Sequence, residues 1–287
     1  MKQSLLLLPN GRSLDYSQEP IVMGILNITP DSFYKGSRYT DLQAALAAAA
    51  KMLESGAKIL DIGGESSRPG SNYIDEKEEL ERILPVIKAI RRNWDIAISV
   101  DTRKSAVAKA ALDQGADIIN DISALGDDPF MAKLCAEKGA AVVLMHKKGI
   151  PLSMQDEPWY EDCVTEVRDY LLAAANRAVQ AGIAREKIIL DPGIGFGKRL
   201  MDNLSILSRL DEFAAAGYPL MAGLSRKAFI GQVSGAEAES RLPGSLAAIC
   251  AARQKGAVFF RVHDAAESVQ ALKVYDKISL ANKSQGN

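Results

Sequence analysis

Short apolar runs alternate along this chain with longer amphipathic stretches, and eight of the runs end abruptly in polar residues. The runs are rich in Ile, Val and Leu with little alternation, which is typical of strands buried on both faces of a parallel sheet. They are Val22–Leu26, Lys58–Ile62, Ile96–Val100, Ile118–Ile119, Ala141–Met145, Ile188–Leu190, Pro219–Leu224 and Val258–Phe260. Their order predicts a repeated unit that gathers polar residues along one rim.

Helical periodicity fills the segments between the runs. The predicted helices are Asp41–Glu54, which has Asp41 as its N-cap, and then Asp75–Arg92, Lys104–Gln114, Asp128–Lys138, Trp159–Ala181, Asp202–Ala216, Ser245–Lys255 and Asp264–Ile278. Six glycines each follow a helix and precede a run, where a left-handed cap is common. They are Gly56, Gly115, Gly139, Gly182, Gly217 and Gly256.

Eight strand–helix units in about 260 residues predict a (β/α)8 barrel, an α/β fold. The alternative is a doubly wound open sheet, but that fold needs a glycine-rich phosphate turn after its first strand, and residues 27–30 read Asn-Ile-Thr-Pro. Asn10 and Gly11 predict the turn of a short β-hairpin. We therefore expect one domain with a hairpin at 1–20, a barrel at 21–280 and a frayed tail at 281–287.

Composition supports one soluble enzyme-sized domain. The chain has 287 residues, 47% hydrophobic and 25% charged, with a net charge of −1, so no nucleic-acid or membrane partner is indicated. Its three cysteines are odd in number and form no C-x-x-C pair, so neither a disulfide framework nor a zinc site is indicated, and the cytoplasm is favoured. The apolar run Leu5–Leu8 is too short for a secretory signal, and no run is long enough for a membrane helix.

In (β/α)8 barrels the site lies at the carboxyl ends of the strands, so the polar residues there are the candidates. Arg261 and His263 are two residues apart and point the same way from an extended strand. With Arg226 and Lys227 after the preceding strand, they predict an anion site, because the guanidinium fork fits a phosphate. The alternative is a rim salt bridge to Asp264 or another acid.

A second group contains two carboxylates and an amide, Asp101, Asn120 and Asp191. Together they could hold a heterocycle with an amidine-like donor edge, such as a pterin or guanine. Each could instead cap a helix, and the residues after Asp101 resemble such a cap. His146 ends the fifth run and is more often structural than catalytic in such a position.

Asn27 ends the first run and offers a carbonyl oxygen for part of a Mg²⁺ site beside a diphosphate, or else a loop cap. The glycine-rich segment Gly193–Lys198 would let backbone approach a ligand, although it lacks the spacing of a Walker loop. The connections 29–40 and 63–75 are long and could close over a substrate.

Several motifs together resemble the dihydropteroate synthases over residues 21 to 275. The matching segments are Gly24–Phe33, Asp61–Gly70, Ser99–Lys104, Ile119–Ile122, Met145–His146, Leu190–Lys198, Ser225–Gly231 and Arg261–Asp264. The resemblance implies a (β/α)8 barrel and a transferase that joins 6-hydroxymethyl-7,8-dihydropterin diphosphate to 4-aminobenzoate. The products would be 7,8-dihydropteroate and diphosphate, with Mg²⁺ as cofactor.

The resemblance also implies roles at matching positions. The pterin would be bound by Asp101, Asn120, Asp191 and Lys227. Diphosphate and Mg²⁺ would be held by Asn27, Arg261 and His263. The 4-aminobenzoate ring would lie near Phe33, Pro69, Phe196 and Lys227, with Ser67 and Arg68 on the second loop. The positions implied to act in the reaction are Asp101, Asp191, Lys227, Arg261 and His263. Sulfonamide inhibition and a homodimer are implied as well.

Two loops depart from the family pattern. Ser67 stands where Thr is usual, and Tyr34 and Lys35 stand where an acid and a glycine commonly follow Phe33. Lys147 and Lys148 are also unusual, and no role is assigned to them. The rival interpretations are a methyltetrahydrofolate:corrinoid methyltransferase domain, which needs no diphosphate site, and a non-catalytic pterin-binding barrel.

Overall fold

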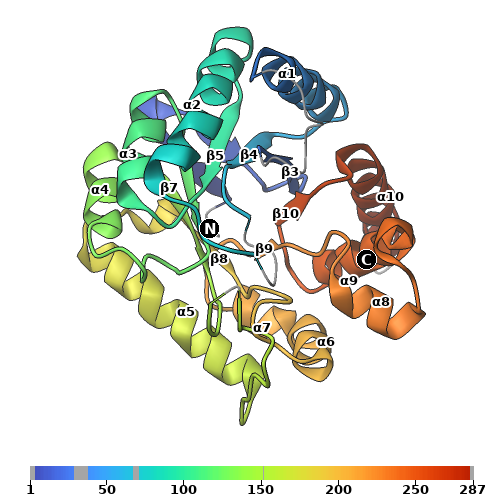
Figure 1. Cartoon of the computed structure of the whole chain (residues 1–287). Coiled ribbons are helices and arrows are strands. Elements are labelled where there is room, and N and C mark those ends of the chain that lie inside the picture. The colour runs from blue at the N-terminus through green and yellow to red at the C-terminus, as the bar shows by residue number, and fades with distance from the viewer. Residues whose placement is uncertain (1–3, 29–37, 67–70, 151, 285–287) are drawn as a thin grey trace.

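Eight parallel strands form a closed barrel, as predicted (Figure 1). The computed structural model describes residues 4–28, 38–66, 71–150 and 152–284. The strand order is β8-β7-β6-β5-β4-β3-β10-β9, and a parallel bridge between Leu190 and Leu220 joins the two ends. The strands are β3 (Ile21–Asn27), β4 (Ile59–Gly63), β5 (Ala97–Asp101), β6 (Ile118–Asp121), β7 (Ala141–Met145), β8 (Ile188–Asp191), β9 (Met221–Ala222) and β10 (Phe259–Val262). Each predicted run contributes one strand.

Helices surround the barrel (Figure 1). They are α1 (Arg38–Glu54), α2 (Glu76–Asn93), α3 (Ser105–Asp113), α4 (Met131–Lys138), α5 (Cys163–Gln180), α6 (Leu200–Ser208), α7 (Leu210–Ala214), α8 (Ala228–Ser234), α9 (Leu242–Gln254) and α10 (Ala265–Ser284). All six predicted cap glycines have positive φ, between 63° and 102°. Among the described residues, no helix is both long and apolar enough to cross a membrane.

Several predicted helix boundaries were wrong. Helix α1 begins at Arg38, so Asp41 lies within it and is not its N-cap. Residues 159–162 precede α5 because Tyr160 is held in the loop, where its hydroxyl donates to Gly197 O. The helix predicted at 202–216 is divided at Arg209 into α6 and α7, and α8 was not predicted. Helix α10 continues to Ser284, four residues into the predicted tail.

The inward-facing residues change from apolar to polar along several of the strands. At the amino ends, residues such as Ile59, Ala97 and Phe259 form a buried cluster inside the barrel. Because side chains alternate across a strand, the next inward position is two residues on, and there stand Asp61 and Arg261, among others. The barrel is therefore packed at one end and polar at the other.

A two-stranded hairpin closes the apolar end. Strands β1 (Leu5–Leu7) and β2 (Ser13–Asp15) pair antiparallel, and both Asn10 and Gly11 have positive φ, which confirms the predicted turn. Leu6 and Leu8 of the hairpin are buried in the same cluster as the amino-end barrel residues. Hydrophobic burial thus attaches the hairpin to the barrel.

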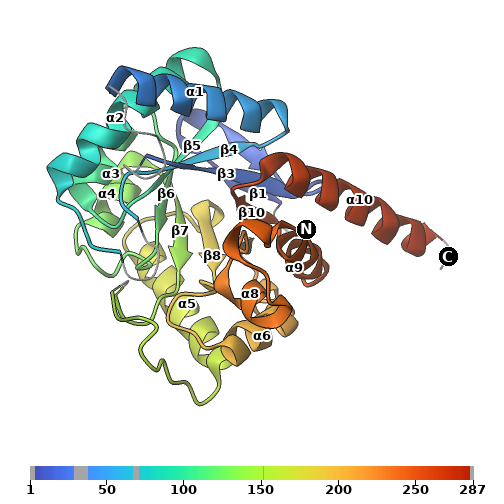
Figure 2. The same ribbon diagram turned by 45° about the vertical axis from the view of Figure 1, so that its right-hand side comes forward.

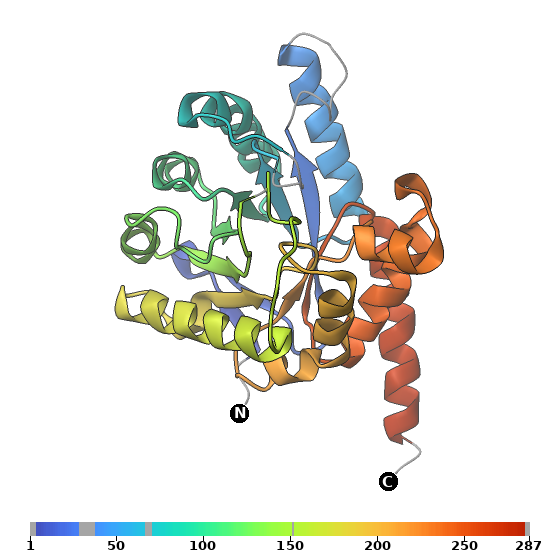
Figure 3. The same cartoon turned by 60° about the horizontal axis from the view of Figure 1, so that its bottom comes forward.

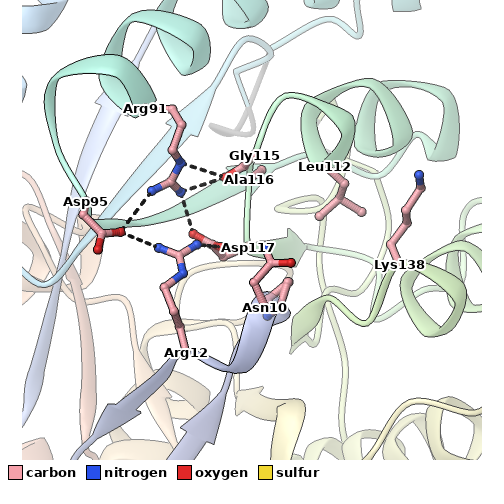
Figure 4. Close-up of a pocket in the computed structure, with 10 residues that line it drawn as sticks. Asn10, Arg12, Arg91, Asp95, Leu112, Gly115, Ala116, Asp117 and Lys138 are labelled. Atoms are coloured by element: carbon pink, nitrogen blue, oxygen red, sulfur yellow. Dashed lines mark hydrogen bonds and ion pairs between the residues drawn. The ribbon is translucent and has the colours of Figure 1, made fainter.

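Ion pairs reinforce this end (Figure 4). Asp117 is almost fully buried and pairs with Arg12 of the hairpin and with Arg91 of α2, the latter at 2.8 Å. Its Oδ2 also accepts a hydrogen bond from the backbone N–H of Ile98 at 2.9 Å. A cavity of 390 Å³ lies beside these residues. Since it is at the amino ends of the strands, we interpret its surroundings as stabilising rather than catalytic.

Candidate active site

The polar end of the barrel is organised around a buried arginine. Arg261 on β10 donates from Nε to Asp61 on β4 and from an Nη to Asp101 on β5, both at 2.6 Å. The Asp101 side chain therefore binds a guanidinium and does not cap α3, which excludes the capping alternative. The sequence also allowed Arg261 to form an ion pair with an acid. That alternative is correct in part, because two of its N–H groups bind Asp61 and Asp101.

Asn120 lies beside this group. Its amide donates to Asp61 at 3.3 Å, while its Oδ1 is buried and has no hydrogen-bond partner. Burying a polar atom without a partner is costly, so this oxygen is a natural acceptor for a ligand N–H. Neither Asn120 nor Asp61 acts as a helix cap.

Asp191 ends β8 and is 3% exposed. One of its oxygens accepts a hydrogen bond from Gly193 N at 2.7 Å, which orients the carboxylate at the start of the glycine-rich loop. Its other oxygen, Oδ2, would lie 3.9 Å from a Cβ added to Gly223. Asp191 is thus held in part by a loop N–H and does not cap α6, whose N-cap is Arg199, so the capping alternative is wrong here as well.

The two carboxylates have perturbed acidities. Burial raises the pKa of Asp101 above its ordinary value, and Arg261 opposes that change. Burial also raises the pKa of Asp191, opposed by Gly193 N–H and by the charge of Lys227. Carboxylates with such pKa values in a polar recess are typical of functional sites.

Asn27 and Asp101 lie on either side of Gly63. A Cβ added to Gly63 would be 3.5 Å from both Asn27 Oδ1 and Asp101 Cβ. The glycine therefore keeps open the space between an amide oxygen and a carboxylate. Among the described residues, no group of three His, Cys, Asp or Glu side chains could hold a metal by itself.

The cationic group predicted at the ends of β9 and β10 divides into two parts. Ser225 Oγ lies 3.2 Å from His263 Nδ1 and accepts a hydrogen bond from His263 N, also at 3.2 Å. Arg226, in contrast, forms a two-point ion pair with Asp264 at 2.9 and 2.7 Å. The prediction that Arg226 contributes to the anion site was therefore wrong, and the salt-bridge alternative is correct there.

An apolar wall adjoins these polar groups. Phe196, in the loop after β8, is buried in a cluster with Ile122, Met145 and Met154. The ammonium of Lys227 lies 4.2 Å from the centre of the Phe196 ring, a cation–π contact. This combination of a flat apolar wall and a cation fits an aromatic ligand that carries a negative charge.

The remaining predicted residues, Phe33, Ser67, Arg68 and Pro69, lie outside the described residues. The chain that flanks the last three is held by Glu65, which accepts from Ile74 N at 2.9 Å and from Lys104 Nζ at 2.8 Å. Sequence reasoning assigned no site role to Asp61 or Glu65. The sequence did contain a signal for Asp61, because it stands two residues after the inward-facing Ile59 and so points into the barrel.

Comparison with known proteins agrees with this geometry. A family model described as "Pterin binding enzyme" matches residues 23–263, which defines the class of protein. The chain is 46% identical over 270 residues to the dihydropteroate synthase of Escherichia coli K12, with 94% of this chain and 95% of the relative covered. It is 43% identical over 264 residues to that of Bacillus subtilis, with coverages of 92% and 90%. The chain belongs to the dihydropteroate synthase family.

Solved structures are similar over the same range. The Xanthomonas albilineans dihydropteroate synthase with 4-aminobenzoic acid has a TM-score of 0.88 and 42% identity, covering 95% of this chain and 98% of that chain. The Yersinia pestis enzyme in a sulfonamide drug complex has a TM-score of 0.89 and 42% identity, with coverages of 96% and 99%.

Proposed function

We propose that this chain condenses 6-hydroxymethyl-7,8-dihydropterin diphosphate with 4-aminobenzoate to give 7,8-dihydropteroate and diphosphate. The observation that carries the proposal is the buried group at the carboxyl ends of β5, β6 and β8, which contains Asp101, Asp191 and an Asn120 oxygen that has no hydrogen-bond partner. A pterin offers N–H donors to carboxylates and both donors and acceptors to an amide. Membership of the family supports the same assignment.

The chemistry follows from the charges of these residues. The bond between the pterin methylene carbon and the diphosphate oxygen breaks, and its electron pair leaves with diphosphate. Asp101 and Asp191 stabilise the positive charge that develops on the pterin, while Arg261 and His263 stabilise the departing anion. The nitrogen lone pair of 4-aminobenzoate then forms the new C–N bond, and its released proton passes to diphosphate or water.

Mg²⁺ is part of the proposal. Asn27 contributes one neutral oxygen on the rim that Gly63 keeps open, which fits an ion that takes few protein ligands and keeps phosphate oxygens and water. When bound there, it would neutralise part of the diphosphate charge.

The arylamine is assigned to the wall formed by Phe196 and Lys227. Its ring would pack on Phe196, and its carboxylate would be attracted by the ammonium of Lys227. From the family pattern we also place Phe33, Ser67 and Pro69 around this ring and Arg68 toward the diphosphate. Sulfonamides, which share the aniline ring, should compete with 4-aminobenzoate, as the Yersinia pestis complex suggests.

A homodimer in the cytoplasm completes the proposal. Helix α10 projects beyond the barrel (Figures 2 and 3) and exposes Val274 and Ile278, which are four residues apart and share one face. The cytoplasm is supported by Cys135, Cys163 and Cys250, all of which are free thiols. Sedimentation of the wild type against Val274→Lys would test the dimer, and a change toward monomer in the variant is expected.

Calorimetry tests the pterin assignment. We expect the pterin diphosphate to bind with Mg²⁺ and much more weakly after EDTA treatment, and 4-aminobenzoate to bind well only afterwards. A methyltetrahydrofolate:corrinoid methyltransferase domain would bind methyltetrahydrofolate and show no Mg²⁺ dependence. Failure of the pterin diphosphate to bind in the presence of Mg²⁺ would refute the proposal.

A further inference from the structure

The loop after β8 follows a path that is fixed by its surroundings. Gly193, Gly195 and Gly197 all have positive φ. A Cβ on Gly193 would lie 2.0 Å from His146 O, and one on Gly197 would lie 2.2 Å from Lys148 O. The loop is therefore packed tightly against the chain that follows β7, and it presents Phe196 to the apolar wall of the site.

Lys198 holds this loop from below. Lys198 is 3% exposed, and the described contacts of its ammonium are with backbone carbonyls and a histidine ring. Lys198 Nζ donates to Gly193 O at 2.9 Å and to Phe196 O at 3.1 Å, and it lies 2.9 Å from His146 Nδ1. These three close acceptors match the three N–H bonds of an ammonium, and His146 O lies farther away at 3.5 Å. The contact set therefore favours the protonated lysine even though burial lowers its pKa to about 7.

His146 is the third acceptor and is neutral. Burial, with the positive charge of Lys198, lowers the pKa of His146 to about 2. Since Nδ1 faces the lysine donor, the ring proton is on Nε2. The ring also packs edge-on against Tyr170, with centroids 4.9 Å apart. The histidine at the end of the fifth run, whose role the sequence left open, is thus a fixed acceptor beneath the glycine-rich loop.

We propose that Lys198 and His146 form a positioning pair that sets Phe196 against the arylamine. The pair touches the loop carbonyls that flank Phe196 and does not extend to the reacting atoms. This inference rests on the proposed function, because the arylamine is assigned to Phe196 there. The effect of losing the pair should fall on 4-aminobenzoate more than on the pterin diphosphate. Of the three residues assigned to the pterin, Asp101 and Asn120 lie on other strands, and Asp191 meets the loop only through Gly193 N.

Two lysine variants test the pair. Lys198→Met keeps the length of the side chain and removes its three donors. The matched control is Lys187→Met, since Lys187 also donates to a backbone carbonyl, Gly139 O at 2.5 Å, but at the opposite end of the barrel. We expect Lys198→Met to raise the KM for 4-aminobenzoate by about tenfold or more, with the KM for pterin diphosphate within about threefold of wild type. The control should match wild type in both.

Two histidine variants keep the test decisive if Lys198→Met does not fold. His146→Asn keeps an acceptor near the Nδ1 position, whereas His146→Leu removes it. We expect the Asn variant to remain within about twofold of wild type and the Leu variant to show the selective rise in arylamine KM. Equal rises for both substrates, or arylamine KM values like that of Lys187→Met, would overturn the inference.

A readout without turnover separates this inference from the proposed function. Nitrogen NMR of His146 should show the neutral ring with its proton on Nε2 down to about pH 5, well below the ordinary histidine pKa. An imidazolium at that pH would overturn the pair even in an active enzyme. An inactive wild type that shows the neutral tautomer would refute the proposed function and leave the pair standing.

Discussion

At the scale of single residues, the site depends on buried charges whose partners lie far apart in the sequence. Arg261 joins Asp61 and Asp101, which precede it by 200 and 160 residues. A pattern of strand endings predicts that such side chains share a rim, because parallel strands end at the same edge. It does not predict which of them pair, since that depends on side-chain geometry in the closed barrel.

Substitution of Arg261 should affect both the stability of the barrel and its activity. Arg261→Ala leaves two buried carboxylates without their cation, and breaking such a pair costs about 3–5 kcal/mol. Arg261→Lys keeps the charge and loses the planar fork. We expect a lower Tm mainly in the Ala variant and a fall in kcat/KM in both, measured by thermal melts and diphosphate release. Wild-type activity in Arg261→Lys would contradict the assigned role of the guanidinium.

Substitution of Asp191 should change thermal stability and pterin affinity in opposite directions. Burial raises the pKa of Asp191, so the folded state binds its proton more tightly than the unfolded chain does. The contribution of this proton to the free energy of unfolding is therefore present at low pH and is lost as pH rises through the folded pKa. Asp191→Asn removes that cost at neutral pH and can still accept from Gly193 N. We expect Tm to rise by about 2–4 °C.

The same substitution should weaken pterin binding, because one acceptor oxygen becomes a donor. Affinity of the wild type should likewise fall as pH decreases through the raised pKa of Asp191. Calorimetry across pH measures both effects. Unchanged pterin affinity in Asp191→Asn would exclude its carboxylate from the pterin site.

At the scale of elements, the predicted helix boundaries lie close to the observed ones where no tertiary contact holds the chain in another conformation. The helix predicted from Asp75 begins one residue later, because Asp75 is its N-cap and its side chain accepts from Glu78 N. The stretch before α5 was predicted to be helical, but Tyr160 is bonded to the glycine-rich loop. Helix α8 is only seven residues long, too short for periodicity to reveal it.

The hairpin gives a prediction at this scale. Arg12 connects it to the buried Asp117 at the apolar end of the barrel (Figure 4). Arg12→Ala should cost about 1–3 kcal/mol and lower Tm by about 2–6 °C, with kcat/KM unchanged. Asp95→Asn is the control, because Asp95 is 88% exposed in its pair with Arg12 and such pairs contribute little. A loss of activity at wild-type Tm would contradict the stabilising role.

At the scale of the whole molecule, the closed eight-stranded barrel was predicted because every run ends in polar residues and is followed by a helix or turn. The same order predicts that Asp101, Asn120 and Asp191 lie at one end of the barrel. The Lys198–His146 pair proposed to position the glycine-rich loop could not be predicted, because Lys198 contacts backbone carbonyls and His146 is engaged through one ring nitrogen. Contacts of that kind produce no recognisable residue spacing in the sequence.

The central claim is that this rim couples loss of diphosphate to attack by an arylamine. The most direct measurement is a coupled assay of diphosphate release from the dihydropterin diphosphate, with 4-aminobenzoate and Mg²⁺ present or omitted. We predict rapid release only when all three are present, formation of an equal amount of dihydropteroate, and inhibition by a sulfonamide. Absence of diphosphate release in the complete mixture, or release that does not depend on 4-aminobenzoate, would contradict the account.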